Sequence, residues 1–296
     1  MERWILAAVW ATLPVTAGGA LADATADWST APQVVLAVLV WTAWAAALLA
    51  IVVPRPVGLT LVRTVAPCFV VAAVLVAVGA VGTDVDTVAA ATAVVATLVA
   101  QVLVSRPPLA FLAVNALAYG DESRYPLRVP TGLFLGPLPL ARLVLGAAVA
   151  SGPLLLADER WVAGIVAVIV AVPVVTLAAR ALHGLSIRWA VLVPAGFVVV
   201  DALTLSDPVL FVREHIVSLS PAPAAAPAGD DLLDLRLGAS FGSVTLAVDE
   251  PAELFRAERR RRSTHAVTAS RICVATLAAD RLLAEAAERR IPVVVA

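Results

Sequence analysis

The sequence lacks several residue types in a way that narrows its class. It has no lysine, so that all 21 basic residues are arginines, and only 15% of its 296 residues are charged. Hydrophobic residues make up 61% of the chain, and the mean hydropathy is +0.95. A soluble domain averages about 45–50% apolar and about 25% charged residues, so this composition indicates a membrane protein.

Cysteine and histidine are also scarce. The two cysteines and three histidines are scattered along the chain, which excludes a disulfide framework and offers no metal-ligand spacing. There is no Gly-rich phosphate loop with its lysine and no His-Glu-x-x-His motif. We therefore predict no cofactor, no metal site and no catalytic residues, and an enzyme is the class that the sequence favours least.

Six apolar runs are long enough to cross a bilayer, which requires about 20 helical residues. They lie near 4–22, 33–53, 59–81, 86–105, 137–157 and 161–182. The first run ends in Ala20-Leu21-Ala22, which also fits a cleaved signal peptide, but Glu2 weakens the positive charge expected before such a peptide. Trp41 and Trp44 in the second run share one helix face, and we interpret them as packing within the bundle.

The charges between the runs alternate in sign and predict the orientation. Arginines occupy one set of connections: Arg3, Arg55 with Arg63, the segment from Arg106 to Arg142, and Arg180 with Arg188. The other set carries Asp23 with Asp27, Asp84 with Asp86, and Asp158-Glu159-Arg160, and is acidic on balance. Because basic connections stay inside the cell, we expect a multi-pass protein of the cell (plasma) membrane with both termini in the cytoplasm.

The longest connection, 105–136, carries a concentration of polar residues. We expect it to be cytoplasmic, with an in-plane helix or an ordinary connector between 109 and 128. Its candidate interaction residues are Asn115, Tyr119, Asp121, Glu122, Arg124, Tyr125 and Arg128. Since this loop and the C-terminal region share one compartment, we expect them to touch.

The region 183–296 has the pattern of an α+β domain built on antiparallel strands. Two strands between Ile187 and Val200 form a hairpin, strands follow at 209–212 and 216–219, and alternating Leu233, Leu235 and Leu237 predict another. A strand at 244–248 precedes a helix that begins at Asp249-Glu250-Pro251 and ends in Arg259, Arg260, Arg261 and Arg262. A short strand at 271–276 and an amphipathic helix at 277–291 complete it.

The four consecutive arginines allow two interpretations. They are a candidate contact for anionic lipid headgroups or an acidic partner. Alternatively, they are a solvated helix end placed favourably at the negative end of the helix dipole.

The C-terminal region resembles the bacterial pleckstrin-homology-like domains in its succession of hairpin strands and a closing helix. The residues that carry the resemblance are Arg188 to Val193, Phe197 to Asp201, 209–219 and the helix 277–291. The whole chain also resembles uncharacterised multi-pass membrane proteins of high-G+C actinobacteria, a likeness that implies no activity.

These features predict an α-helical polytopic membrane protein of six spans with two domains. Residues 1–182 form the transmembrane domain and residues 183–296 the cytoplasmic domain. The favoured function is a non-enzymatic membrane protein whose cytoplasmic domain binds a protein partner in envelope assembly or regulation. The alternative is a transporter or lipid-handling protein that uses the Arg-bearing segment 105–142; membrane lipid is a partner in either case, nucleic acid is not expected, and the oligomeric state stays open.

Overall fold

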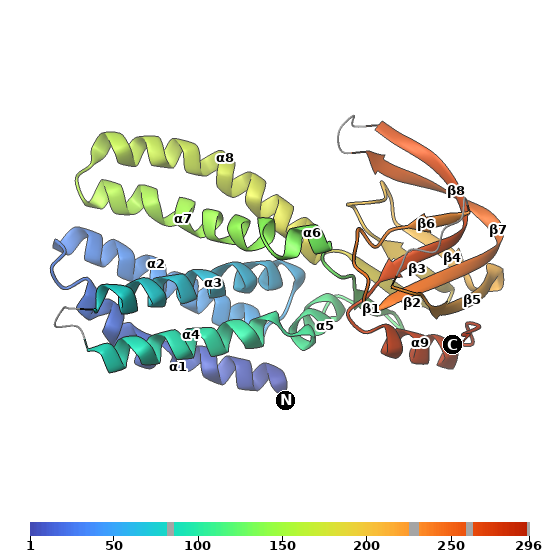
Figure 1. Ribbon diagram of the computed structural model, residues 1–296, viewed down its shortest axis with the longest axis horizontal. Coiled ribbons are helices and arrows are strands. Elements are labelled where there is room, and N and C mark those ends of the chain that lie inside the picture. The colour runs from blue at the N-terminus through green and yellow to red at the C-terminus, as the bar shows by residue number, and fades with distance from the viewer. Residues whose placement is uncertain (82–85, 225–230, 259–262, 295–296) are drawn as a thin grey trace. The chain divides into compact units, whose positions relative to one another are not determined.

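The computed structural model describes residues 1–81, 86–224, 231–258 and 263–294 (Figure 1). It divides into two compact units. The helical unit comprises residues 1–113 and 138–183, and the sheet unit comprises 114–137 and 184–296. Most of the long connection 105–136 belongs to the sheet unit, which the chain enters again at residue 184.

Six long apolar helices form the helical unit, as predicted, and each is long and apolar enough to cross a membrane. They are α1 (Glu2–Ala24), α2 (Thr30–Val52), α3 (Pro56–Gly79), α4 (Thr87–Ser105), α7 (Pro137–Ala157) and α8 (Trp161–Ser186). Alanines such as Ala20, Ala73 and Ala93 form the contact among α1, α3 and α4, because small side chains allow close approach of helices. Few side chains of helices α7 and α8 are buried.

The strands of the described residues form two four-stranded sheets. The first has the order β1 (Ser123–Pro126), β2 (Trp189–Val193), β3 (Gly196–Val200), β4 (Val209–Val212), with every pair antiparallel. The second has the order β5 (Ile216–Pro221), β7 (Ser243–Glu258), β8 (Ser263–Ala275), β6 (Leu232–Asp234). The predicted hairpin and the strands at 209–212 and 216–219 are confirmed, as is the closing helix, α9 (Ala279–Glu288).

The long connection supplies the first strand of this domain. The connection begins with the helix α5 (Pro107–Asn115), and residues 123–126 then pair with β2 from Ser123 opposite Leu192 to Pro126 opposite Trp189. A short helix, α6 (Thr131–Phe134), then leads to α7. The loop and the C-terminal region therefore touch, as expected, and they do so as neighbouring strands of one sheet.

The helix predicted from Asp249 onward is wrong over the described residues. Residues 243–258 form one long strand, β7, and the arginines at 259–262 lie outside the described residues. The acids and proline that resembled a helix start fall where the β7–β8 register shifts, between Ala247 and Ala252. A proline is tolerated at such a bulge because no ladder hydrogen bond is required of it.

Two further expectations need correction. The strand predicted around Leu233, Leu235 and Leu237 is only three residues long, and β6 pairs with β8 in parallel, so the second sheet is mixed. Leu237 leaves the strand with a positive φ of 53° and is exposed. The strand predicted at 271–276 is in turn the end of a longer one, because β8 begins at Ser263.

One buried ion pair holds three segments of the sheet unit together. Arg188, just before β2, binds both carboxylate oxygens of Asp201, just after β3, at 2.6 and 2.7 Å. Its third nitrogen donates to the backbone oxygen of Arg128 at 2.9 Å, and its own backbone oxygen accepts from Leu127. Both charged side chains are almost fully buried, and a buried pair of this kind is stable only when its remaining donors and acceptors are also satisfied.

Replacing Asp201 by Asn should destabilise the sheet unit by about 3–5 kcal/mol, because the Arg188 charge would stay buried without its counter-ion. Hydrogen exchange of β2 and β3 in the full-length protein in detergent micelles measures this loss. The combined change Arg188→Met with Asp201→Leu should restore part of the protection, since no lone charge remains. Asp231→Asn, in the exposed pair with Arg271, is the matched control and should change little; equal protection in Asp201→Asn and wild type would contradict the role of the pair.

Candidate functional site

The predicted loop residues lie in the sheet unit, where most of them contact their own domain. The side-chain amide of Asn115 donates to the backbone oxygen of Arg124 at 2.9 Å and its oxygen accepts from the backbone nitrogen of Arg124 at 2.8 Å. Asn115 thus pairs with β1 as a neighbouring strand would. The Arg124 side chain binds Glu122 at 2.6 Å and lies over the ring of Trp189, so these side chains fasten the loop.

The Tyr125 side chain connects the loop to α9. Its buried hydroxyl donates to the carboxylate of Glu285. Burial and this contact raise the pKa of Tyr125 well above its usual range. Burial also opposes ionisation of Glu285, but hydrogen bonds from Ser123, Tyr125 and Arg289 outweigh it and lower the pKa of this carboxyl. Arg289 also donates to the backbone oxygen of Asp121.

The remaining two loop residues differ in role. Arg128 donates from its backbone to Ala275 at 2.8 Å and from its side chain to the backbone oxygen of Thr276 at 3.1 Å, so it holds the loop on the end of β8. Tyr119 is 90% exposed. Its side chain is therefore turned toward the surroundings.

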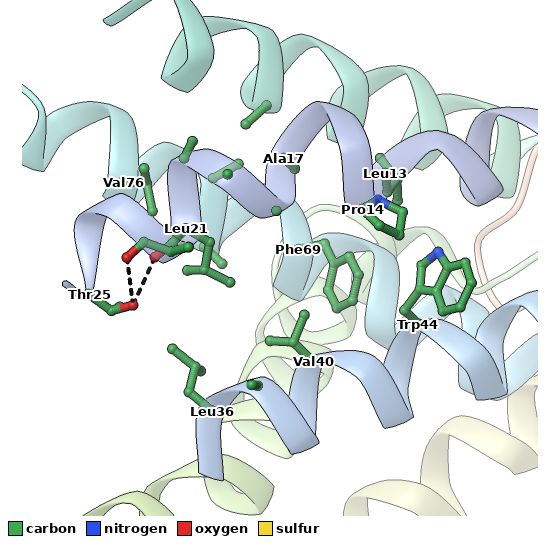
Figure 2. Close-up of a pocket in the computed structure, with 18 of the residues that line it drawn as sticks. Leu13, Pro14, Ala17, Leu21, Thr25, Leu36, Val40, Trp44, Phe69 and Val76 are labelled. Carbon is green, nitrogen blue, oxygen red and sulfur yellow. Dashed lines mark hydrogen bonds between the residues drawn. The ribbon is translucent and has the colours of Figure 1, made fainter. Parts of the chain in front are cut away.

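A large apolar pocket lies in the helical unit, between α1 and α2 (Figure 2). Its volume is about 790 Å³, within the range of about 300–1,000 Å³ that small-molecule sites occupy. Figure 2 shows Leu36, Val40 and Trp44 of α2 on the side facing α1, with Phe69 of α3 between the two helices. The α1 side is formed by Pro14, Ala17, Gly18, Leu21 and Thr25, which share one helix face.

Hydrogen bonds join the two helices at both ends of the pocket. At one end, the indole nitrogens of Trp10 and Trp44 each donate to the other residue's backbone oxygen, at 3.0 and 2.9 Å. At the other end, the amide of Gln33 donates to the backbone oxygens of Thr25 and Ala26, at 2.8 and 3.1 Å. α1 and α2 are therefore joined at both ends of the pocket, and α1 carries small residues between these two contacts. These small side chains leave the space between the helices unfilled.

The chemistry of the lining is almost wholly apolar. None of the lining residues is charged. The Thr25 hydroxyl donates to backbone oxygens of its own helix, and the Trp41 and Trp44 rings meet edge to face at 5.3 Å. The interpretation of the two tryptophans as packing residues is thus incomplete, because they also line the pocket. The pocket offers contacts for an apolar chain and no charged group for a polar one.

Within the described residues, no three His, Cys, Asp or Glu side chains group to hold a metal ion. Cys273 is fully buried, which raises the pKa of its thiol and disfavours a nucleophilic thiolate. Sequence reasoning overlooked a Gly-x-Ser-x-Gly spacing at 238–242, but the strand β7 follows it where a nucleophile elbow requires a helix.

The pocket was missed because no sequence motif marks it. Its usable signals are the adjacent Gly18 and Gly19 within an apolar helix and the pair Trp41 and Trp44. Neither reveals that the two helices separate between their joined ends, which depends on tertiary contacts.

Tyr125→Phe should loosen α9, because a hydrogen bond to a charged group contributes about 1.5–3 kcal/mol. Hydrogen exchange of α9 at neutral pH is the measurement, and Tyr119→Phe, at the other tyrosine, should leave it unchanged. The pKa of Glu285 is lowered in the folded protein. The stability that its carboxylate contributes is therefore complete above the ordinary carboxyl pKa and is lost as pH falls through the lowered value. The difference between Tyr125→Phe and wild type should therefore shrink in acid, and a difference that persists there would contradict this account.

Comparison of the chain with models of protein families, with curated proteins and with solved structures finds no match.

Proposed function

We propose that this chain is an integral membrane protein that binds the apolar chain of a lipid within its helical unit. The observation that carries the proposal is the 790 Å³ pocket between α1 and α2. The pocket supports the lipid-handling alternative, but the proposed binding site is in the helical unit and not at the Arg-bearing segment. The pocket is lined by residues of α1 to α4 and their connections, and the Arg-bearing segment 105–142 contributes none of these residues.

The membrane location is supported by the length and apolarity of six helices. It is further supported by the alternation of charge between them, which favours cytoplasmic termini and a cytoplasmic sheet unit. In this orientation, the Gln33 end of the pocket lies toward the outer face of the membrane. An acyl chain that enters from the bilayer exchanges one apolar environment for another, so burial alone does not favour the pocket. Contacts with the tryptophan rings and the fit to the pocket's shape would make the chain prefer the pocket to the bilayer.

A protein partner at the sheet unit is a second candidate, favoured by the outer edge of β4. Two other outer strands have occupied edges: Asn115 bonds to β1, and Val293 pairs with Leu219 of β5. In the described part of the chain no strand covers β4, where Leu210 and Val212 are exposed. An uncovered edge strand is a template for an added strand, and the two sheets with their closing helix also support the resemblance to pleckstrin-homology-like domains.

Gly18→Phe should block lipid binding without disturbing the fold. A Cβ added at Gly18 meets no atom within 4 Å, so the ring can enter the pocket, and phenylalanine is no worse than glycine in a helix. The full-length protein, reconstituted with a phosphatidylcholine that carries a diazirine on its acyl chain, is irradiated and the labelled peptides are quantified. Labelling of α1 and α2 relative to α8 should fall at least three-fold.

The matched control is Gly79→Phe. Gly79 is also helical and open to an added Cβ, but it does not line the pocket, so its variant should label as wild type does. Equal labelling in Gly18→Phe and Gly79→Phe would show that the probe reports only general contact with the bilayer, and the proposal would then fail.

The second candidate has its own test in cells. A photo-crosslinking amino acid at position 210, on the free edge, should give one discrete protein adduct. The same amino acid in place of Phe255, which is exposed on the interior strand β7, should give none. Absence of a discrete adduct at position 210 counts against a partner at this edge.

A further inference from the structure

Two segments of the sheet unit carry large apolar side chains that are turned outward. Phe134 and Leu135 lie at the end of α6, and Leu237 and Phe241 lie in the connection from β6 to β7; all four are exposed, Phe241 to 76%. The hydroxyl of Thr131 donates to the backbone oxygen of Gly238 at 2.7 Å and joins the two segments. We call these four side chains the apolar rim.

The backbone of the second segment is held in an unfavourable conformation at Leu237. Leu237 has a φ of 53°, Gly238 of 85° and Gly242 of 65°. A leucine rarely adopts a positive φ, because its Cβ crowds the backbone. A Cβ at Gly242 would lie 2.3 Å from the backbone oxygen of Thr276. The loop is therefore fixed closely on β8, and the conformation that leaves Leu237 and Phe241 exposed is one that the surroundings must stabilise.

The charge around the rim suits a membrane surface. No acidic residue occurs between Leu127 and Arg142 or between Leu235 and Val248. Leu135 lies two residues before Pro137, the first residue of α7, so chain connectivity keeps this part of the rim beside the start of a candidate span. Exposed apolar side chains next to a bilayer bury themselves at the boundary between headgroups and acyl chains.

We propose that the apolar rim inserts into the bilayer interface beside α7, so that the sheet unit binds the lipid surface directly. The ligand is the interfacial layer of the membrane itself. The proposal rests on the crossing of the membrane by α7, and it is independent of the pocket between α1 and α2. The described residues of the domain leave Phe134 and Phe241 exposed, and insertion into the bilayer interface would bury them in lipid.

The test uses the full-length protein in liposomes, with Cys68 and Cys273 replaced by alanine and one new cysteine labelled with a nitrobenzoxadiazole dye. The new cysteine replaces Phe241 in the rim, Val217 on β5 or Val149 in α7, all of which are exposed. Quenching by a doxyl-labelled phosphatidylcholine is then measured at each position. Phe241→Cys should be quenched at least two-fold more strongly than Val217→Cys, with a blue-shifted emission.

The control positions separate the possible failures. If Val149→Cys is quenched while Phe241→Cys resembles Val217→Cys, the rim stays in water and the inference is overturned, although α7 still crosses the membrane. If Val149→Cys is unquenched as well, α7 does not cross the membrane and this inference falls with it, whereas the pocket between α1 and α2 is judged by its own labelling experiment.

Discussion

The sheet unit depends on the buried contact between Arg188 and Asp201. This pair lies where the ends of β2 and β3 meet the loop residues Leu127 and Arg128. It therefore joins a segment that precedes α7 in the sequence to segments that follow α8. Neither charge can be left alone in the interior without a large cost. The pair therefore makes the placement of the loop a condition for folding of the C-terminal domain, and the loop becomes part of that domain.

A second constraint acts in the helical unit. Reciprocal hydrogen bonds between Trp10 and Trp44 join α1 and α2 at one end, and Gln33 joins them at the other. Helices joined at two points cannot close completely over a stretch of small residues such as Ala17 and Gly18. The pocket is thus a consequence of where polar groups find partners in an apolar bundle, in which each unsatisfied donor would be costly.

The sequence predicts those features that depend on local pattern. Six helices follow from apolar length and the β2–β3 hairpin from a valine-rich run broken by Pro194 and Gly196. Features set by distant partners were not predicted. Tyr125 in β1 pairs with Ala190 in β2, and three helices lie between these strands in the sequence; the four residues of β1 are too few to show a strand pattern. The stretch at Asp249 to Pro251 imitates a helix start locally, yet it sits in a bulge whose partner strand lies beyond 263. Most of the candidate loop residues bond within their own domain, whereas Tyr119 is largely exposed.

The interleaved chain also limits how the two units can act. The chain passes between them near 113, 137 and 183, so the sheet unit is tied to α5, α7 and α8. A fragment that begins at 184 would lack β1, the Arg128 backbone oxygen that Arg188 binds, and the hydroxyl that contacts Glu285. Such a fragment would bury donors without acceptors and expose an edge of β2. The domain is therefore complete only when the loop residues 114–137 are present with the C-terminal region.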